Sequence, residues 1–144
     1  MRRAICIAVA ASLAALSLAG PASAQEVVKT GETAAGSAVK LAVAEFGNAT
    51  SFQIASTKVE CNHGTLTTGR SVFKPLDTSD PGSFSHQVGD VQKDGKVRLK
   101  TKIRISGTDD GTGVWNGQFK RVTKVVKHWR KIDTCRLRTS WTAS

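Results

Sequence analysis

The chain has 144 residues, of which 21 are Lys or Arg and 11 are Asp or Glu, so its formal net charge is +10 at pH 7. This length suits one domain and argues against two. The charge is uneven, because residues 25–95 carry a net charge of −2, whereas residues 96–144 hold thirteen Lys and Arg against three acidic residues. The cationic character therefore belongs to the C-terminal part.

Residues 1–24 have the order of a secretory signal peptide. Arg2 and Arg3 give a positive start, residues 4–19 are uncharged and mostly apolar, and Ala22-Ser23-Ala24 supplies the small residues of a cleavage site. The apolar run is shorter than the roughly 18–20 residues that span a bilayer, which makes a permanent anchor the weaker interpretation. We expect cleavage near Ala24 and a secreted product, either extracellular or periplasmic.

The three cysteines predict one disulfide. Cys6 would be removed with the signal peptide, which leaves Cys61 and Cys135 as an even pair in an oxidising compartment. Closing a loop of about 75 residues would contribute roughly 4.5 kcal/mol to stability in the loop-entropy description. A redox or metal-binding pair is the alternative, but the two residues do not form a Cys-x-x-Cys motif.

The N-terminal half of the expected mature chain changes its pattern at residue 39. Residues 25–38 are rich in Gly, Thr, Ala and Glu without a clear period, and we expect a flexible lead-in there. From residue 39 apolar and polar residues alternate, as in strands with one buried face. The expected strands cover 39–44, 52–54, 59–61 and 65–72, with turns at 47–48 and 62–64 and a break near Ser56-Thr57.

The second half continues the alternation between stronger turn signals. Two prolines indicate a loop over residues 74–83, Asp94-Gly95 predicts a tight turn, and residues 108–113 predict another. The expected strands cover 84–88, 96–105, 115–119 and 135–141. This succession predicts an all-β fold, a single antiparallel β-sandwich or small barrel over residues 39–144 with one disulfide. The predicted buried face holds Leu41, Val43, Phe52, Ile54, Leu99, Ile103, Ile105, Trp115, Phe119, Leu137 and Trp141.

Residues 96–105 have the sharpest alternation in the chain. The odd-numbered positions, from Val97 to Ile105, should point to one side of a strand, and a row of cations to the other. This row consists of Lys96, Arg98, Lys100, Lys102 and Arg104. It would be about 27 Å long, and neighbouring charges would repel by only about 0.6 kcal/mol in bulk water. The row is tolerable without a ligand, yet it would attract an extended polyanion.

A second basic segment, residues 120–138, has eight Lys or Arg and one acidic residue, Asp133. Within it Trp129 stands among cations, which suits stacking on a base, a sugar face or a lipid headgroup while the cations bind phosphate or sulfate. These neighbouring cations are Lys127, Arg130 and Lys131. The open alternatives are a plain solvated face, pairing of the row with N-terminal acids, and Trp129 as a core residue or as a cover for one end of the sandwich. If the row and this cluster share a face, binding is favoured; opposite faces would favour solubility.

Signals for catalysis are weak. The sequence has no nucleophile elbow and no phosphate-cradling glycine motif. His63, His86 and His128 are scattered without metal-site spacing; we expect His63 at the surface and His86 half-buried with a hydrogen-bond partner. Asp109-Asp110 indicates a turn more than a pair of catalytic acids. We therefore expect no catalytic residue, no metal and no cofactor.

Four short motifs give the chain a resemblance to a known group of proteins: Cys61-x-x-Gly64, Asp94-Gly95-Lys96, Trp115-x-Gly117-x-Phe119 and the ending Cys135 to Ala143 with Trp141-Thr142. In these the chain resembles small secreted bacterial β-sandwich domains of the actinobacterial type, whose function is uncharacterised. Such domains often carry Gly soon after the last cysteine, where this chain has Arg136-Leu137-Arg138. The resemblance implies a fold and a compartment, and it transfers no functional residue.

Together these patterns favour a secreted, non-catalytic domain that binds an anionic partner through its basic C-terminal half. The candidate partners are anionic polysaccharide, cell-wall polymer, nucleic acid and lipid headgroups. The alternative is a structural or protein-interaction domain whose charge only maintains solubility. A secreted hydrolase, which would need a pocket that gathers His86 or His128 with a carboxylate, is the less favoured interpretation. The oligomeric state is left open.

Overall fold

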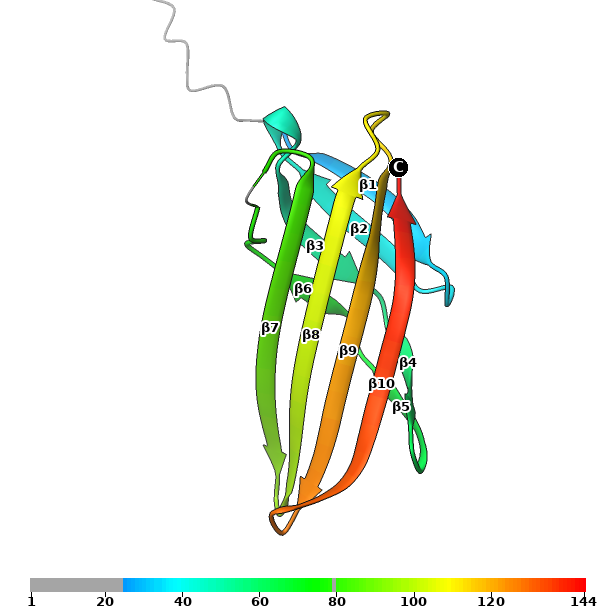
Figure 1. The fold of residues 1–144 in the computed structure, drawn as a ribbon, viewed down its shortest axis with the longest axis vertical. Helices are drawn as coiled ribbons and strands as arrows, with labels where there is room; N and C mark the ends of the chain where they lie inside the picture. Colours follow the sequence, from blue (N-terminus) through cyan, green and yellow to red (C-terminus); the bar gives the residue numbers. More distant parts are fainter. Residues whose placement is uncertain (1–24, 79) are drawn as a thin grey trace, which may run out of the picture.

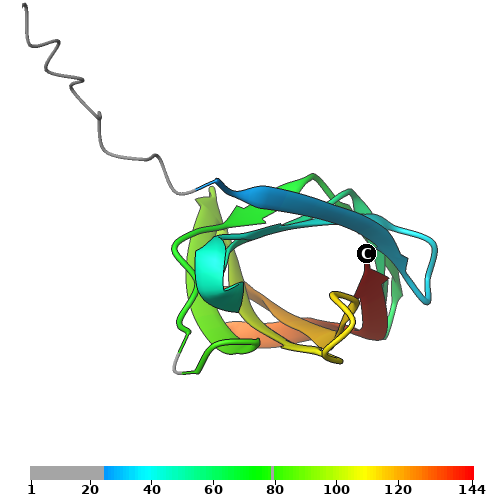
Figure 2. The ribbon, with the colours of Figure 1, turned by 90° about the horizontal axis from the view of Figure 1, so that it is seen from above.

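The computed structural model describes residues 25–78 and 80–144, and the expected signal peptide with Cys6 lies outside them. The chain forms one antiparallel sheet of ten strands, which curls into a half-barrel (Figure 1, Figure 2). The strands are β1 (Val27–Thr33), β2 (Ala38–Val43), β3 (Ala49–Ile54), β4 (Thr57–Cys61), β5 (Gly64–Thr68), β6 (Ser71–Phe73), β7 (Ser83–Asp94), β8 (Val97–Asp109), β9 (Trp115–Lys127) and β10 (Arg130–Ala143), with a short 3-10 helix η1 (Glu45–Gly47). The predicted all-β fold with one disulfide is confirmed.

The sheet has two parts that cross at an angle. Strands β7 to β10 follow one another as long antiparallel hairpins and lie side by side (Figure 1). Strands β6, β3, β2 and β1 continue the sheet from β10 and curl over its inner side, as the view from above shows (Figure 2). The β4–β5 hairpin pairs with β10 beside β1. The curled sheet thus supplies both walls of a single core.

The core consists of aromatic and branched side chains on the inner face of the curl. Trp141 on β10 lies 5.0 Å from Phe52 on β3 and 6.1 Å from Phe84 on β7, measured between ring centroids, so one indole joins the two walls. Of the eleven core residues predicted from the sequence, Leu99 and Leu137 are only half-buried and the others are buried. Buried residues that the prediction missed include Val39, Ala49, Val59, Phe73, Leu76 and Phe84.

Two glycines make room for the Trp141 ring. Gly107 on β8 pairs with Gly117 on β9, which pairs with Trp141 on β10, so the three residues form a row on the inner face. A Cβ at Gly107 would lie 2.7 Å from the indole, and one at Gly117 would lie 2.5 Å from it and 2.0 Å from the Ser106 carbonyl oxygen. Side chains are therefore excluded at both positions by packing.

The structure corrects the expectation of a flexible lead-in over residues 25–38. This segment contains β1, which pairs with β2 from Val27 to Glu32 and with β10 from Gly31 to Thr33. Thr33 is its only buried residue, so the strand is held by backbone hydrogen bonds and shows little of the apolar alternation that reveals a strand in sequence. The Thr50 hydroxyl also donates a hydrogen bond to the Glu26 carboxylate.

We expect Gly117→Ala to lower the free energy of unfolding by roughly 1–3 kcal/mol, because the added methyl would force Trp141 and the β8 backbone apart. In a domain of this size the change corresponds to a fall of several degrees in Tm, measured by circular dichroism. Gly69→Ala is the matched control, since a Cβ there meets nothing within 4 Å. Equal Tm values for the two variants would contradict this account of the packing.

Candidate anion-binding face

The cation row predicted from residues 96–105 lies on the outer side of β8. Thr101, Ile103 and Ile105 are buried, whereas Lys100, Lys102 and Arg104, which alternate with them, are exposed. The predicted alternation is thus confirmed. The structure corrects the predicted position of Lys96. Strand β8 begins at Val97, and Lys96 forms a two-residue turn with Gly95. The row on the strand therefore has four cations, from Arg98 to Arg104.

Strand pairing brings further cations beside this row. Even-numbered residues of β8 pair with even-numbered residues of β9, and these positions share the outer side. The partners of these β9 residues on β10 are even-numbered from Thr134 onward, but the register shifts between Lys131 and Asp133, so Val126 pairs with Lys131. On β7 the odd-numbered residues pair with the even-numbered residues of β8. The cations at these outward positions form what we call the basic face: Lys93, Arg98, Lys100, Lys102, Arg104, Lys120, Lys124, Lys131, Arg136 and Arg138. None of the outward positions of β7 to β10 holds an acidic residue.

Several cations of the basic face stand directly opposite one another. The register pairs Lys93 with Arg98, Lys100 with Lys124, and Lys120 with both Arg104 and Arg138. Directly opposite side chains lie about 5 Å apart, and like charges at such positions are destabilising. In bulk water the repulsion is about 0.8 kcal/mol for each pair before salt screens it. The basic face therefore concentrates positive charge at a cost in stability.

Acidic partners for the basic face are scarce. In the part of the chain that the structure describes, the ion pairs are His63–Asp133 and His86–Asp77, and neither includes a Lys or Arg. Glu60 on β4 is the register partner of Arg136 and borders the face at one edge. The described contacts therefore do not support the alternative in which N-terminal acids neutralise the row.

The turn between β9 and β10 carries Trp129 at one end of the basic face. Lys127 pairs with Arg130, so His128 and Trp129 form a two-residue turn, and both have positive φ, 47° and 67°. Positive φ at both central residues is the signature of a type I′ turn, which normally takes Asn and Gly. Trp129 is 82% exposed, which rules out the interpretation of this residue as part of the core.

The row and the cluster predicted at residues 127–131 meet at this turn. The Arg98 guanidinium carbon lies 4.2 Å from the centroid of the Trp129 ring, in a cation–π contact. A shallow hollow of about 160 Å³ lies between the two turns, and it is lined by Gly95, Lys96, Arg98, Val126, His128 and Trp129. The structure thus brings Lys96, the row, Trp129 and Lys131 together on one surface. Lys127 and its partner Arg130 are exposed but take inward positions in the register, so they do not belong to the basic face.

Arg121 shows that not every cation of this region belongs to the basic face. It points inward on β9, where its Nε donates a long hydrogen bond, 3.5 Å, to the Thr123 hydroxyl. Burial lowers the pKa of the Arg121 guanidinium, and the charge of Asp90 on the same side partly opposes this. Arg121 is therefore a charge of the inner face.

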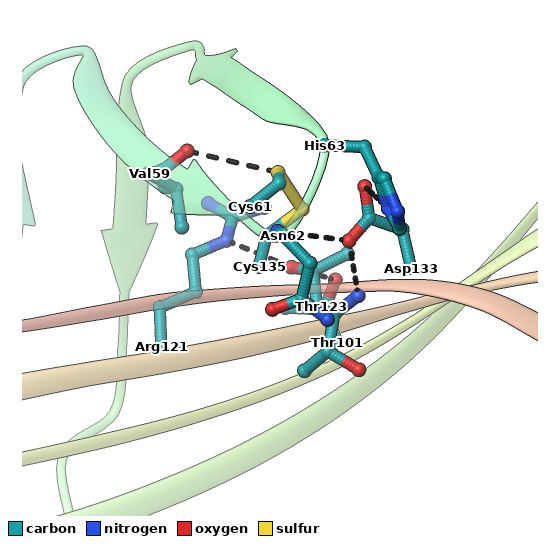
Figure 3. Close-up of a disulfide and its surroundings, with 10 residues drawn as sticks. Val59, Cys61, Asn62, His63, Thr101, Arg121, Thr123, Asp133 and Cys135 are labelled. Atoms are coloured by element: carbon teal, nitrogen blue, oxygen red, sulfur yellow. Dashed lines mark hydrogen bonds and ion pairs between the residues drawn. A yellow bond between two sulfur atoms is a disulfide. The ribbon is translucent and has the colours of Figure 1, made fainter.

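The disulfide and Asp133 fix the β4–β5 hairpin to β10 (Figure 3). Cys61 and Cys135 are bonded, as predicted, and are register partners of β4 and β10. Beside them the Asp133 carboxylate accepts hydrogen bonds from the backbone N–H of Asn62 at 3.0 Å and of Thr134 at 2.6 Å. Desolvation opposes ionisation of Asp133, but these two donors and the charge of His63 outweigh it and lower the pKa of the carboxyl.

The histidines and acids considered as catalytic candidates make hydrogen bonds and ion pairs within the fold. His86 is mostly buried and bonds through Nδ1 to Asp77 at 3.1 Å, whereas His63 is exposed beside Asp133, as the sequence predicts for both. The Asp109 carboxylate accepts the N–H groups of Gly111 and Gly113 in the β8–β9 turn. Within residues 25–78 and 80–144, no three His, Cys, Asp or Glu residues gather as a metal site.

Comparisons with protein-family models, with curated proteins and with solved structures found no match for this chain. Among the residues that the structure describes, no helix has the length and apolar character needed to cross a membrane. The fold and the surface themselves define a small, basic, disulfide-bonded all-β domain with a cationic outer face.

We expect Asp133→Asn to lower Tm at neutral pH, because the variant loses a carboxylate that the folded state stabilises. With its pKa lowered on folding, Asp133 contributes fully above the ordinary Asp value of about 3.9 and loses this contribution as pH falls through the lower folded value. The difference in Tm between variant and parent should therefore shrink as pH falls below about 4.

Thermal melts from pH 7 to pH 2, with the disulfide intact, measure this difference. Asp94→Asn is the control, since it removes the same charge from the β7–β8 turn, where no hydrogen bond to the carboxylate is formed by the described residues. A constant Tm difference for Asp133→Asn over the whole pH range would contradict the assigned role.

Proposed function

We propose that this protein is an exported, non-catalytic β domain that binds an anionic polymer or surface through its basic face. The observation that carries the proposal is the composition of this face: ten cations and no acidic residue at the outward positions of β7 to β10. A surface of one sign, several strands wide, raises the local concentration of anionic partners and speeds their association.

The arrangement of the cations supports binding over mere solubility. Dispersed lysines keep a domain soluble, and a surface with both signs interspersed serves this purpose. Here Lys100 stands opposite Lys124, and Lys120 stands between Arg104 and Arg138, so repulsion is built into the sheet. An anionic ligand would remove this repulsion, because each phosphate or sulfate group could lie between two cations.

Export is supported by the N-terminal pattern and by the disulfide. Disulfides persist in oxidising compartments, and the bonded pair Cys61–Cys135 fits a product outside the cytosol. Anionic polymers and lipid surfaces are both exposed to proteins released there. The cationic face of an exported protein would therefore meet such partners outside the cytosol.

The test is retention of the mature protein on heparin across a salt gradient. The triple variant Lys100→Glu, Lys102→Glu and Lys124→Glu changes three exposed side chains in the centre of the basic face, none of which donates a hydrogen bond to another described side chain. We expect the parent to elute late and the triple variant near the void volume, because binding falls steeply as phosphate or sulfate contacts are lost.

A second triple variant separates position from net charge. Lys40→Glu, Lys58→Glu and Lys74→Glu alter the charge by the same amount at exposed sites on β2, on β4 and in the loop after β6. We expect this variant to elute between the parent and the first variant, much nearer to the parent. Identical elution of the two triple variants would refute a specific role for the basic face.

A further inference from the structure

Exposed apolar side chains lie among the cations of the basic face. Val91 on β7 is the register partner of Lys100 and is 54% exposed. Val122 and Val126 occupy outward positions of β9 and are half-buried. Trp129 lies at the end of this surface, and Ile132, in the irregular stretch of β10 that follows, is 49% exposed. The surface is therefore both cationic and apolar at the end that bears Trp129.

The β9–β10 turn holds an aromatic residue where the backbone disfavours one. Bulky side chains are uncommon at positive φ, and a residue kept in such a conformation often serves a function. Asn-Gly would form this type I′ turn without strain. The conformation leaves the Trp129 ring exposed beside Arg98. The β9–β10 turn that carries this ring lies at one end of the molecule (Figure 1).

We infer that the basic face docks on a bilayer of anionic phospholipid, with the Trp129 ring inserted among the headgroups. This inference rests on the proposed function, since it names the anionic surface that the face binds. Lys and Arg attract anionic lipid headgroups, and tryptophan is the residue type enriched at the interface between water and hydrocarbon. Both kinds of group are present here on one side of one sheet.

The apolar residues favour a bilayer over a soluble polyanion. A sulfated sugar or a phosphate backbone would contact the cations but would leave Val91 and Ile132 in water. A base could stack on Trp129, yet the face has no second exposed Trp, Tyr or Phe ring on which a neighbouring base would stack. A lipid surface covers aliphatic and aromatic side chains together while its headgroups meet the cations.

The intrinsic tryptophan fluorescence of the protein can report this contact. Trp115 and Trp141 are 1% exposed, whereas Trp129 is 82% exposed, so changes in tryptophan fluorescence on docking arise from Trp129. The mature protein is mixed with vesicles of phosphatidylglycerol and phosphatidylcholine, or of phosphatidylcholine alone. With the anionic vesicles we expect co-sedimentation, a blue shift of the emission and protection from acrylamide quenching. With phosphatidylcholine alone we expect none of these.

Two variants separate insertion of Trp129 from general adsorption. Trp129→Gly should fold at least as well as the parent, because glycine suits φ of 67°, but should bind anionic vesicles about tenfold more weakly by sedimentation. Phe46→Gly is the matched control. Phe46 is 86% exposed with φ of 66°, but it lies in η1 at the opposite end of the molecule, so vesicle binding should be unchanged (Figure 1).

The outcomes distinguish this inference from the proposed function. Retention on heparin without binding to anionic vesicles would overturn the inference and leave the proposed function standing, with a soluble polyanion as partner. Loss of both would overturn both. Vesicle binding without a blue shift, and equal for Trp129→Gly and the parent, would show adsorption by charge alone and would overturn insertion of Trp129.

Discussion

The register of the four long strands β7 to β10 is the constraint on which the rest of the molecule depends. It places Gly107, Gly117 and Trp141 side by side on the inner face, where the indole joins both walls of the core. Side chains alternate along a strand, so the same register directs the intervening lysines and arginines outward. A slip of one residue would exchange the two sides and bury the cations. Packing inside the curl therefore positions the charges outside it.

The alternation along β8 could be read from the sequence, because period-two patterning is local. The wider face could not, since Lys93, Lys120, Lys124, Arg136 and Arg138 join it only through pairing between strands. Strand β1 could not be predicted from the sequence either, because main-chain pairing with its neighbours holds it and it buries almost no apolar side chain. The exposure of Trp129 depends on two φ angles in a turn, which its neighbours in the sequence do not indicate.

The disulfide has a specific place in this arrangement. Strands β1 and β2 and the strands beyond them cover the inner face toward the Trp141 end, whereas β4 and β5 are attached to β10 through two register pairs, one of them the cysteine pair. The covalent bond and the Asp133 carboxylate hold this short hairpin in place. They hold the stretch of β10 that leads to the Trp129 turn, so the covalent link supports the part of the sheet that carries the proposed binding surface.

Repulsion across the basic face and strain in the Trp129 turn both act against the folded domain, and both lie on the surface that we propose binds a partner. A core that is closed by several aromatic contacts can tolerate them, because each costs little compared with a typical domain stability of about 5–15 kcal/mol. An anionic surface would reverse the first effect by neutralising opposed cations. Since such a partner binds the native arrangement of the cations and not the unfolded chain, docking would also stabilise the fold. The repulsion that weakens the isolated domain is thus the feature that a negatively charged partner would remove.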